Sequence, residues 1–223
     1  MPINLAPIVT AIDELKEKTK KRKFIQSVDL LIKIKDVNLK QSKNRINVEV
    51  FLPHEIASSK KICIIGTGDL KVRASKMGLQ VIDKEELEKF EKKNAKKFVK
   101  SMDVFIAGVD LMPLLAKYLG PFLGPAGKMP LGPPKGKGII PPDANLTPIV
   151  EAYRKMVKIR MRNNLVVNCK VGNENMPSKD IAENIQSVTN FLEDTLENGS
   201  RNIDTIYVKT TMGPSIKLNI KIG

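Results

Sequence analysis

The sequence is poor in the residues on which many enzyme sites and disulfide-stabilised folds depend. Its 223 residues include two cysteines and one histidine. Two cysteines exclude a disulfide framework, and with a single histidine they cannot form a zinc finger. Cys63 lies in an apolar run, where we expect a core side chain and not a nucleophile. No carboxylate pair stands out, so hydrolase chemistry has no anchor. We also expect no metal site and no cofactor.

Long apolar runs and aromatic residues are also scarce. No stretch of about 18 apolar residues occurs, so we expect no membrane partner, and the N-terminus does not resemble a signal peptide. A cytoplasmic protein is therefore expected. Aromatic residues make up 4% of the chain and tryptophan is absent, which argues against a surface that mainly stacks unpaired bases. Recognition of folded RNA through its backbone and shape is compatible with this composition.

Acidic residues are outnumbered by basic ones. Lys and Arg number 38 and Asp and Glu number 24, which gives a net charge of +14 and a pI of about 9.7. A solvated lysine-rich surface would give the same balance, but an excess of this size favours a nucleic-acid partner. The excess is largest between residues 59 and 155. Total charge does not locate a specific site.

Apolar and polar residues alternate near both ends of the sequence, which is the pattern of half-buried β-strands. The strands predicted from it span residues 28–34, 46–52, 203–210 and 215–222. A polar stretch joins the first two, so we expect them to form an antiparallel hairpin. The last two flank a Thr-Met-Gly-Pro turn, and one face of this second hairpin is polar and basic.

The middle of the chain has a different pattern. Unbroken apolar strands alternate there with helices, which indicates a parallel sheet covered on both faces. The Gly- and Pro-rich stretch 120–142 is predicted to contain no regular element. We therefore expect a split α+β domain formed by residues 1–58 and 156–223, and an inserted α/β domain formed by residues 59–155.

One motif leaves an enzymatic alternative open. Gly66-Thr67-Gly68 follows a predicted strand, as a dinucleotide-binding fingerprint does, and Asp83 could serve as the acid that binds a ribose. However, Lys71 stands where the third glycine of that fingerprint belongs. An ordinary strand-to-helix turn that requires small residues explains the motif better. Titration with NAD and with RNA would separate a Rossmann-type enzyme from an RNA-binding protein.

The turn between the last two predicted strands has the composition of a contact site. Thr211 offers a hydroxyl to a phosphate or to a ribose 2′-OH, and Met212 offers an adaptable apolar contact. Gly213 allows the backbone to approach a ligand closely. If this turn is open to solvent, Gly213→Val should weaken RNA binding and change thermal stability little.

Four separated motifs occur in the order found in a known family. They are KFIQSVD at residues 23–29, FLPH at 51–54, LGPAGKMP at 123–130 and TTMGPS at 210–215. In these motifs the chain resembles the ribosomal protein L1 family, in its archaeal form. The resemblance implies a split α+β, ferredoxin-like domain I with an inserted Rossmann-like α/β domain II. It also implies a protein that is not an enzyme.

The resemblance further implies partners and contact residues. Members of the family bind the stalk region of the large-subunit rRNA and help to release deacylated tRNA from the exit site. Many also repress translation by binding a similar structure in their own mRNA, and no small-molecule substrate is expected. The RNA-binding residues implied by the family pattern are Lys23, Phe24, Ser27, Thr205, Thr211, Met212, Gly213, Pro214 and Ser215. Lys170, on a neighbouring predicted strand, is added to them.

Overall fold

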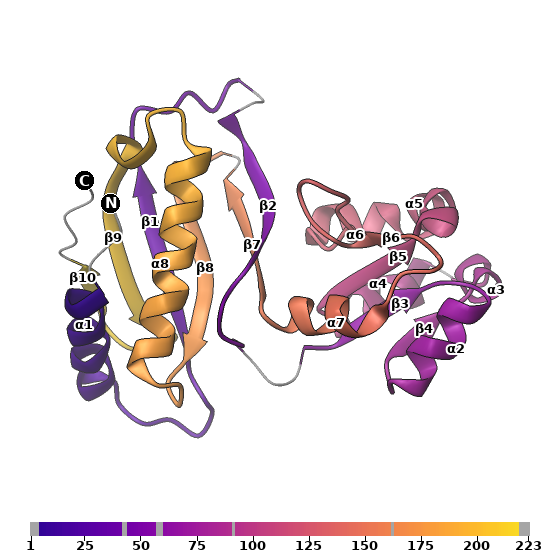
Figure 1. Cartoon of the computed structure of the whole chain (residues 1–223), viewed down its shortest axis with the longest axis horizontal. Helices are drawn as coiled ribbons and strands as arrows, with labels where there is room; N and C mark the ends of the chain where they lie inside the picture. Colours follow the sequence, from indigo (N-terminus) through magenta and orange to yellow (C-terminus); the bar gives the residue numbers. More distant parts are fainter. Residues whose placement is uncertain (1–4, 42–43, 57–59, 91, 162, 219–223) are drawn as a thin grey trace. The chain divides into compact units, whose positions relative to one another are not determined.

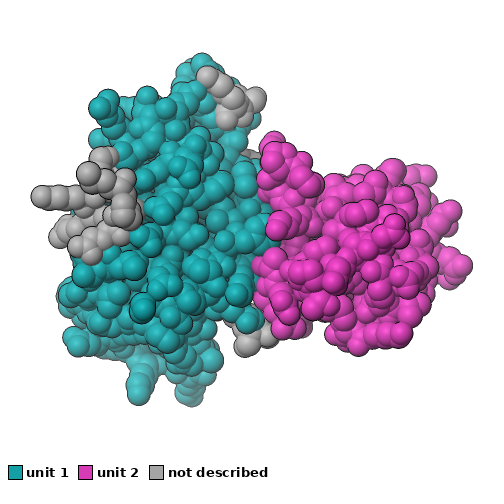
Figure 2. All heavy atoms as spheres, in the orientation of Figure 1, with its two compact units in different colours: residues 1–57, 155–223 teal, residues 58–154 magenta. Residues whose placement is uncertain are grey.

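The chain forms two compact units (Figures 1 and 2). The computed structural model describes all residues except 1–4, 42–43, 57–59, 91, 162 and 219–223. Unit 1 comprises residues 1–57 and 155–223, and unit 2 comprises residues 58–154. The boundaries expected from the sequence differ from these by one residue at each crossing. The expected fold class, which combines α+β and α/β architecture, is confirmed.

Unit 1 contains a four-stranded antiparallel sheet with the strand order β10-β9-β1-β8. The strands are β1 (Ser27–Ile34), β8 (Val166–Asn173), β9 (Ile203–Thr210) and β10 (Ser215–Leu218). Alternate residues of each strand are buried, and they face a core shared with two helices. These are α1 (Leu5–Lys18) and α8 (Ser178–Thr195), which pack against each other and against the sheet (Figure 1). The opposite face of the sheet carries the other set of alternating side chains.

The first two predicted strands do not pair with each other. β1 lies between β8 and β9, whereas β2 (Ile46–Phe51) pairs with β7 (Met156–Met161) in a separate two-stranded sheet. The expected 28–34 and 46–52 hairpin is therefore wrong. Alternation predicts a strand but is satisfied by any partner that buries the same face. The β9–β10 hairpin is confirmed up to Leu218, and the expected residues 219–222 lie outside the described part of the chain.

Unit 2 contains a parallel sheet with the strand order β4-β3-β5-β6. Its strands are β3 (Ile62–Ile65), β4 (Gln80–Ile82), β5 (Val104–Gly108) and β6 (Ile139–Ile140). Every residue of β3 and β5 is buried, so both faces of the sheet are covered, as the unbroken apolar strands predicted. The helices of this unit are α2 (Asp69–Lys76), α3 (Lys84–Glu88), α4 (Lys92–Ser101), α5 (Met112–Tyr118), α6 (Gly120–Ala126) and α7 (Leu146–Arg154).

The Gly- and Pro-rich stretch 120–142 is more regular than expected, because it begins with α6 and also contains β6. Pro121 stands in the first turn of α6, where a backbone N–H would have no partner within the helix. Leu123 is completely buried and fixes the helix in the core of unit 2. Gly127, with a φ of 69°, ends the helix in the left-handed conformation.

Candidate nucleic-acid interface

Two segments that are far apart in the sequence meet at one end of the sheet in unit 1. The register of β1 and β9 places Val28 opposite Thr210, so Ser27 and Thr211 lie side by side. The Ser27 N–H donates to Thr211 Oγ1 over 3.1 Å, and the two hydroxyl oxygens are 2.9 Å apart. The Thr211 N–H donates to the Ser27 carbonyl over 3.1 Å. The loop before β1 is thereby joined to the turn after β9.

Gln26 fixes this junction from inside. Its side chain is completely buried, and its Oε1 accepts a hydrogen bond of 3.1 Å from the Met212 N–H. Its Nε2 donates to the Lys20 carbonyl over 3.1 Å and to Glu174 Oε2 over 3.2 Å. Glu174 Oε1 accepts from the Gln26 N–H over 3.0 Å. The side-chain amide of Gln26 thus connects three segments: the loop that follows α1, the segment between β8 and α8, and the β9–β10 turn.

Sequence reasoning missed Gln26 and Glu174. A single glutamine in a polar loop contributes nothing to a hydrophobic period, and a glutamate before a helix is an ordinary surface residue. The one available signal was the position of Gln26 inside the KFIQSVD motif at residues 23–29. In physical terms, a buried amide that satisfies three partners specifies one arrangement of the segments it joins.

Large apolar side chains are exposed on the segments that Gln26 joins. Phe24 is 51% exposed, Ile25 is 62% exposed and Met212 is 61% exposed. Lys23 precedes Phe24 and is exposed as well. Exposed apolar groups beside cations and hydroxyls are typical of a surface that has a binding partner. We refer to the following residues as the turn surface: Lys23, Phe24, Ser27, Thr211, Met212, Gly213, Pro214 and Ser215.

Gly213 is required by packing inside unit 1. A Cβ at this position would overlap the hydroxyl oxygen of Thr210 and would lie 2.9 Å from the hydroxyl oxygen of Thr19. Thr210 is completely buried, and its hydroxyl lies 3.0 Å from that of Thr19. Because the Thr19 hydroxyl donates its one hydrogen to the Leu15 carbonyl (2.6 Å), Thr210 is the donor to Thr19. The expectation that Gly213→Val would leave thermal stability nearly unchanged is therefore reversed.

The two remaining candidate residues lie on the face of the sheet opposite the helices, outside the turn surface. Thr205 stands six residues before Thr211, which is about 20 Å along a strand. Lys170 pairs with Asp29, and Asp29 pairs on its other side with Lys209. Ser215 of β10 pairs with Lys209. The structure therefore places Lys170 in the same row as Ser215 and places Thr205 at a distance from both.

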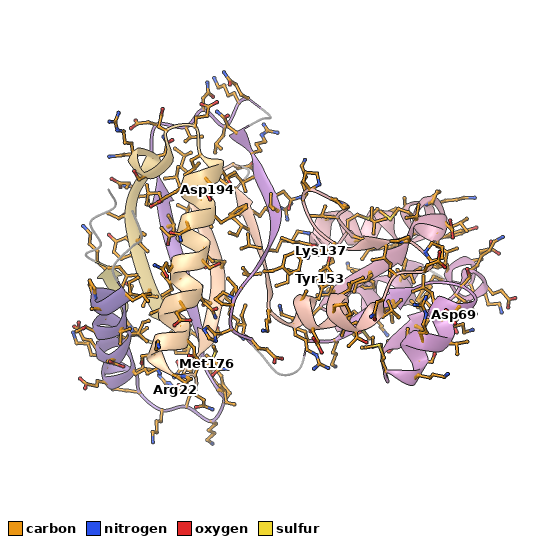
Figure 3. All side chains as sticks on the ribbon, in the orientation of Figure 1. Arg22, Asp69, Lys137, Tyr153, Met176 and Asp194 are labelled. Atoms are coloured by element: carbon orange, nitrogen blue, oxygen red, sulfur yellow. The ribbon has the colours of Figure 1, made fainter. Side chains whose placement is uncertain are left out.

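Basic side chains also line a hollow beside the turn surface. It has a volume of about 420 Å³, and Lys16, Lys21 and Arg22 contribute to it together with Thr210 and Glu174. Figure 3 shows Arg22 and Met176 at the same end of unit 1. The ammonium group of Lys16 donates to the Met176 carbonyl over 2.5 Å, and burial lowers its pKa although Asp13 opposes this. Positive charge thus continues from the turn surface to the C-terminal end of α1.

Asp83, the acid of the enzymatic alternative, forms contacts within the fold, and so do the buried Cys63 and the single histidine. Asp83 accepts a hydrogen bond from the Glu86 N–H (2.9 Å) at the start of α3, and its carboxylate lies 2.6 Å from the ammonium of Lys71. The hydrogen bond from Lys71 lowers the pKa of Asp83. Cys63 is completely buried, and burial raises the pKa of its thiol to about 12. The single histidine, His54, lies 2.6 Å from a carboxylate oxygen of Glu183.

The described residues contain neither a candidate metal centre nor a candidate membrane-spanning helix. No group of three or more His, Cys, Asp or Glu side chains in that part of the chain is placed to hold a metal ion. Within the same residues, no helix combines the length and the apolar composition that crossing a bilayer requires. The candidate interface consists of cations, hydroxyls and exposed apolar groups, all of which can contact a nucleic acid.

Such a two-unit α/β fold with a basic contact surface fits a class of RNA-binding proteins, and sequence comparison identifies the family. Residues 15–214 match the model of the Ribosomal protein L1p/L10e family. The chain therefore belongs to this family, which confirms the resemblance found in its motifs. The family is one of ribosomal proteins and not of enzymes, so the Rossmann-type enzyme is excluded.

Similar proteins cover nearly the whole chain and come from archaea. The large ribosomal subunit protein uL1 of Pyrococcus abyssi is 42% identical over 221 residues, which are 98% of this chain and 98% of that protein. The protein of the same name from Thermococcus kodakarensis is 40% identical over 98% of this chain and 99% of its own length. That of Methanocaldococcus jannaschii is 40% identical over 95% of this chain and 94% of its own length.

Proposed function

We propose that unit 1 binds the stalk region of the large-subunit rRNA through the turn surface, and that the chain is a structural constituent of the large ribosomal subunit. The observation that carries this proposal is the buried Gln26, which joins the 23–27 loop to the 211–215 turn. It presents Phe24 and Met212, which are both more than half exposed, on a fixed support. The names of the archaeal relatives support the ribosomal location, which is cytoplasmic.

Five side chains of the turn surface have a role in this proposal. Lys23 neutralises a backbone phosphate, and the hydroxyls of Ser27 and Thr211 meet ribose 2′-OH groups or phosphate oxygens. Phe24 and Met212 cover the apolar faces of a ribose or a base and exclude water from these polar contacts. Because Gln26 holds the two segments before RNA arrives, little conformational entropy is lost on binding.

Two residues of the sheet face extend the proposed contact. Lys170 shares a row of the sheet with Ser215, so it reaches a phosphate that lies beside the turn surface. Thr205 stands about 20 Å from the turn and contacts the RNA only if the RNA runs along the strand. Asp29, between Lys170 and Lys209, prevents this face from binding polyanions without regard to their shape.

Two further activities are proposed on the basis of family membership. The chain assists the release of deacylated tRNA from the exit site, and it represses translation of its own mRNA by binding a structure similar to the rRNA stalk. The rRNA stalk and the mRNA element bind the same turn surface, so these two RNAs compete. Addition of stalk RNA should therefore relieve repression of a reporter that carries the mRNA element. Repression that persists with saturating stalk RNA would contradict a shared site.

Met212→Ala tests the proposed rRNA site. Because Met212 is 61% exposed, its truncation should leave folding intact. We expect filter binding to a stalk transcript to weaken by about ten-fold, which corresponds to about 1.4 kcal/mol. Met77→Ala is the matched control, since Met77 is a 39% exposed methionine of unit 2 and should bind the transcript as the wild type does. Equal affinities for both variants would remove the turn from the site.

A further inference from the structure

Unit 2 carries an apolar groove bordered by lysines, at a site that the RNA contacts proposed for unit 1 do not use. It lies where α4 and α6 pack against each other and has a volume of about 400 Å³. We refer to it as the α4–α6 groove. Its lining includes Lys96, Val99 and Lys100 of α4 and Phe122, Pro125 and Ala126 of α6.

The floor of the groove is apolar and its shape is fixed. Val99 is buried, and Phe122 is half-buried against the core of unit 2. Lys128, just after α6, donates hydrogen bonds to the carbonyls of Val99 (2.9 Å) and Met102 (2.6 Å) at the end of α4. These two bonds connect the C-terminal ends of the two helices. The groove is therefore formed before any partner binds, which lowers the entropic cost of binding.

The border of the groove is strongly basic. The ten residues of α4 include five lysines and no acidic residue. Among the described residues, no ion pair is formed by Lys96, Lys97 or Lys100. Lys96 and Lys100 are one helical turn apart and both line the groove, whereas Lys97 on the same helix does not. Two unpaired cations thus stand at the edge of an apolar surface.

We propose that the α4–α6 groove binds an acidic amphipathic segment of a protein partner. Apolar side chains at helical spacing fill the floor, and carboxylates that flank them pair with Lys96 and Lys100. The net charge of +14 repels a second copy of this chain and attracts an acidic peptide. RNA phosphates could also pair with Lys96 and Lys100. However, the floor of Val99, Phe122, Pro125 and Ala126 offers no side-chain hydrogen-bond donor to a ribose.

The probe for this proposal is a fluorescein-labelled peptide of about 14 residues, which is roughly 20 Å of helix. It has leucine and phenylalanine at alternating spacings of three and four, and glutamate at most other positions. We expect saturable binding to the full chain by fluorescence anisotropy. A peptide of the same composition, scrambled to remove the helical period, should bind at least about ten-fold more weakly. Absence of saturable binding, or equal binding of both peptides, would overturn the proposal.

Variants of the full chain locate the binding. Lys96→Glu combined with Lys100→Glu should weaken binding of the peptide by at least about ten-fold. Lys97→Glu removes the same kind of charge from the same helix, outside the groove, and should change affinity by less than about two-fold. Ala126→Gln places a larger, neutral side chain on an exposed part of the floor and should also weaken binding, with an unchanged melting temperature. A Lys97→Glu effect as large as that of the double variant would indicate diffuse attraction and overturn the assignment.

The same variants separate peptide binding from RNA binding. Stalk-transcript affinity should be the same for the wild type and for Ala126→Gln, because the proposed RNA contacts lie in unit 1. If Ala126→Gln weakens binding of the transcript and the peptide does not bind, the groove is an RNA contact and the proposal fails. If Met212→Ala bound the stalk transcript as tightly as the wild type, the peptide result would still stand, because it concerns different residues and a different ligand.

Discussion

Replacing Gly213 by alanine tests whether the turn surface depends on packing inside unit 1. The added Cβ would overlap the hydroxyl oxygen of Thr210 and would approach that of Thr19 to 2.9 Å. Thr210 is completely buried, so its hydroxyl cannot turn towards solvent. If it moves, the hydrogen bond to Thr19 is lost, and leaving a buried hydroxyl unpaired costs about 1–3 kcal/mol. Strain from overpacking adds about 1–3 kcal/mol.

The two contributions are not additive, because movement of the Thr210 hydroxyl relieves part of the overlap. The expected destabilisation is therefore about 2–4 kcal/mol. For a chain of this length each kcal/mol lowers Tm by about 2–4 °C, so the expected decrease is roughly 5–15 °C. Differential scanning calorimetry measures it directly. A melting temperature within a degree or so of the wild type would refute the packing argument.

A second substitution separates this overlap from a general effect on the turn. Thr210→Ala removes the hydroxyl that the new Cβ would meet and leaves the Cβ of residue 210, which would lie 3.5 Å from that of residue 213. The double variant should therefore be more stable than the sum of the two single changes predicts, by about 1 kcal/mol or more. Additive effects would mean that Thr210 is not what excludes a side chain at Gly213.

Three further predictions concern charge and titration. Lys23→Ala should flatten the dependence of log affinity for stalk RNA on log salt by about 0.7–0.9, measured by filter binding at several salt concentrations; an unchanged slope would remove Lys23 from the site. Lys71→Ala should raise the pKa of Asp83 towards its ordinary value, as followed by NMR of the carboxyl group. Because the pKa of Asp83 is lowered in the folded chain, its contacts stabilise the fold above the unfolded pKa and are lost as the pH falls through the folded pKa, so the stability difference between wild type and Lys71→Ala should vanish on acidification. Burial raises the pKa of Cys63 and Cys169 to about 12, so neither thiol should react with Ellman's reagent at neutral pH until guanidinium unfolds the chain; rapid reaction of the native protein would contradict this.

Much of the fold follows from local pattern. The alternation over residues 203–210 predicted β9 with its observed ends, and the unbroken apolar strands of the middle segment predicted a buried parallel sheet. Strand pairing was not predictable in the same way. Any alternating strand can bury its apolar face against several partners, so the sequence did not distinguish a β1–β2 hairpin from the observed position of β1 between β8 and β9.

The helix α6 shows a different limit of local rules. Two prolines and two glycines in seven residues argue against a helix, but Pro121 lies in its first turn and Leu123 is buried in the core. Tertiary packing outweighs the low propensity of such a segment. Only knowledge of which residue reaches the core would have corrected the prediction.

The candidate site was partly predictable. The motifs located Phe24 and Met212, and the structure brings their segments together. Gln26 joins these segments, but no sequence pattern indicated that it is buried, because burial of a loop residue depends on neighbours from distant parts of the chain. Gly213 was selected because glycine lets the backbone approach a ligand, whereas in the structure the Thr210 hydroxyl leaves no room for a side chain at this position.

The central position of β1 has a consequence for synthesis of the chain on a ribosome. Unit 2 is one continuous segment, so its sheet can form as soon as residues 58–154 have left the exit tunnel. β1 emerges earlier but must wait for β8 and β9, which are translated after the whole of unit 2. Until then both edges of β1 lack hydrogen-bond partners, and unpaired strand edges can pair with other chains and aggregate. The proposed RNA surface cannot exist before Thr211 reaches Ser27, so a nascent chain cannot present this surface to RNA until unit 1 is complete.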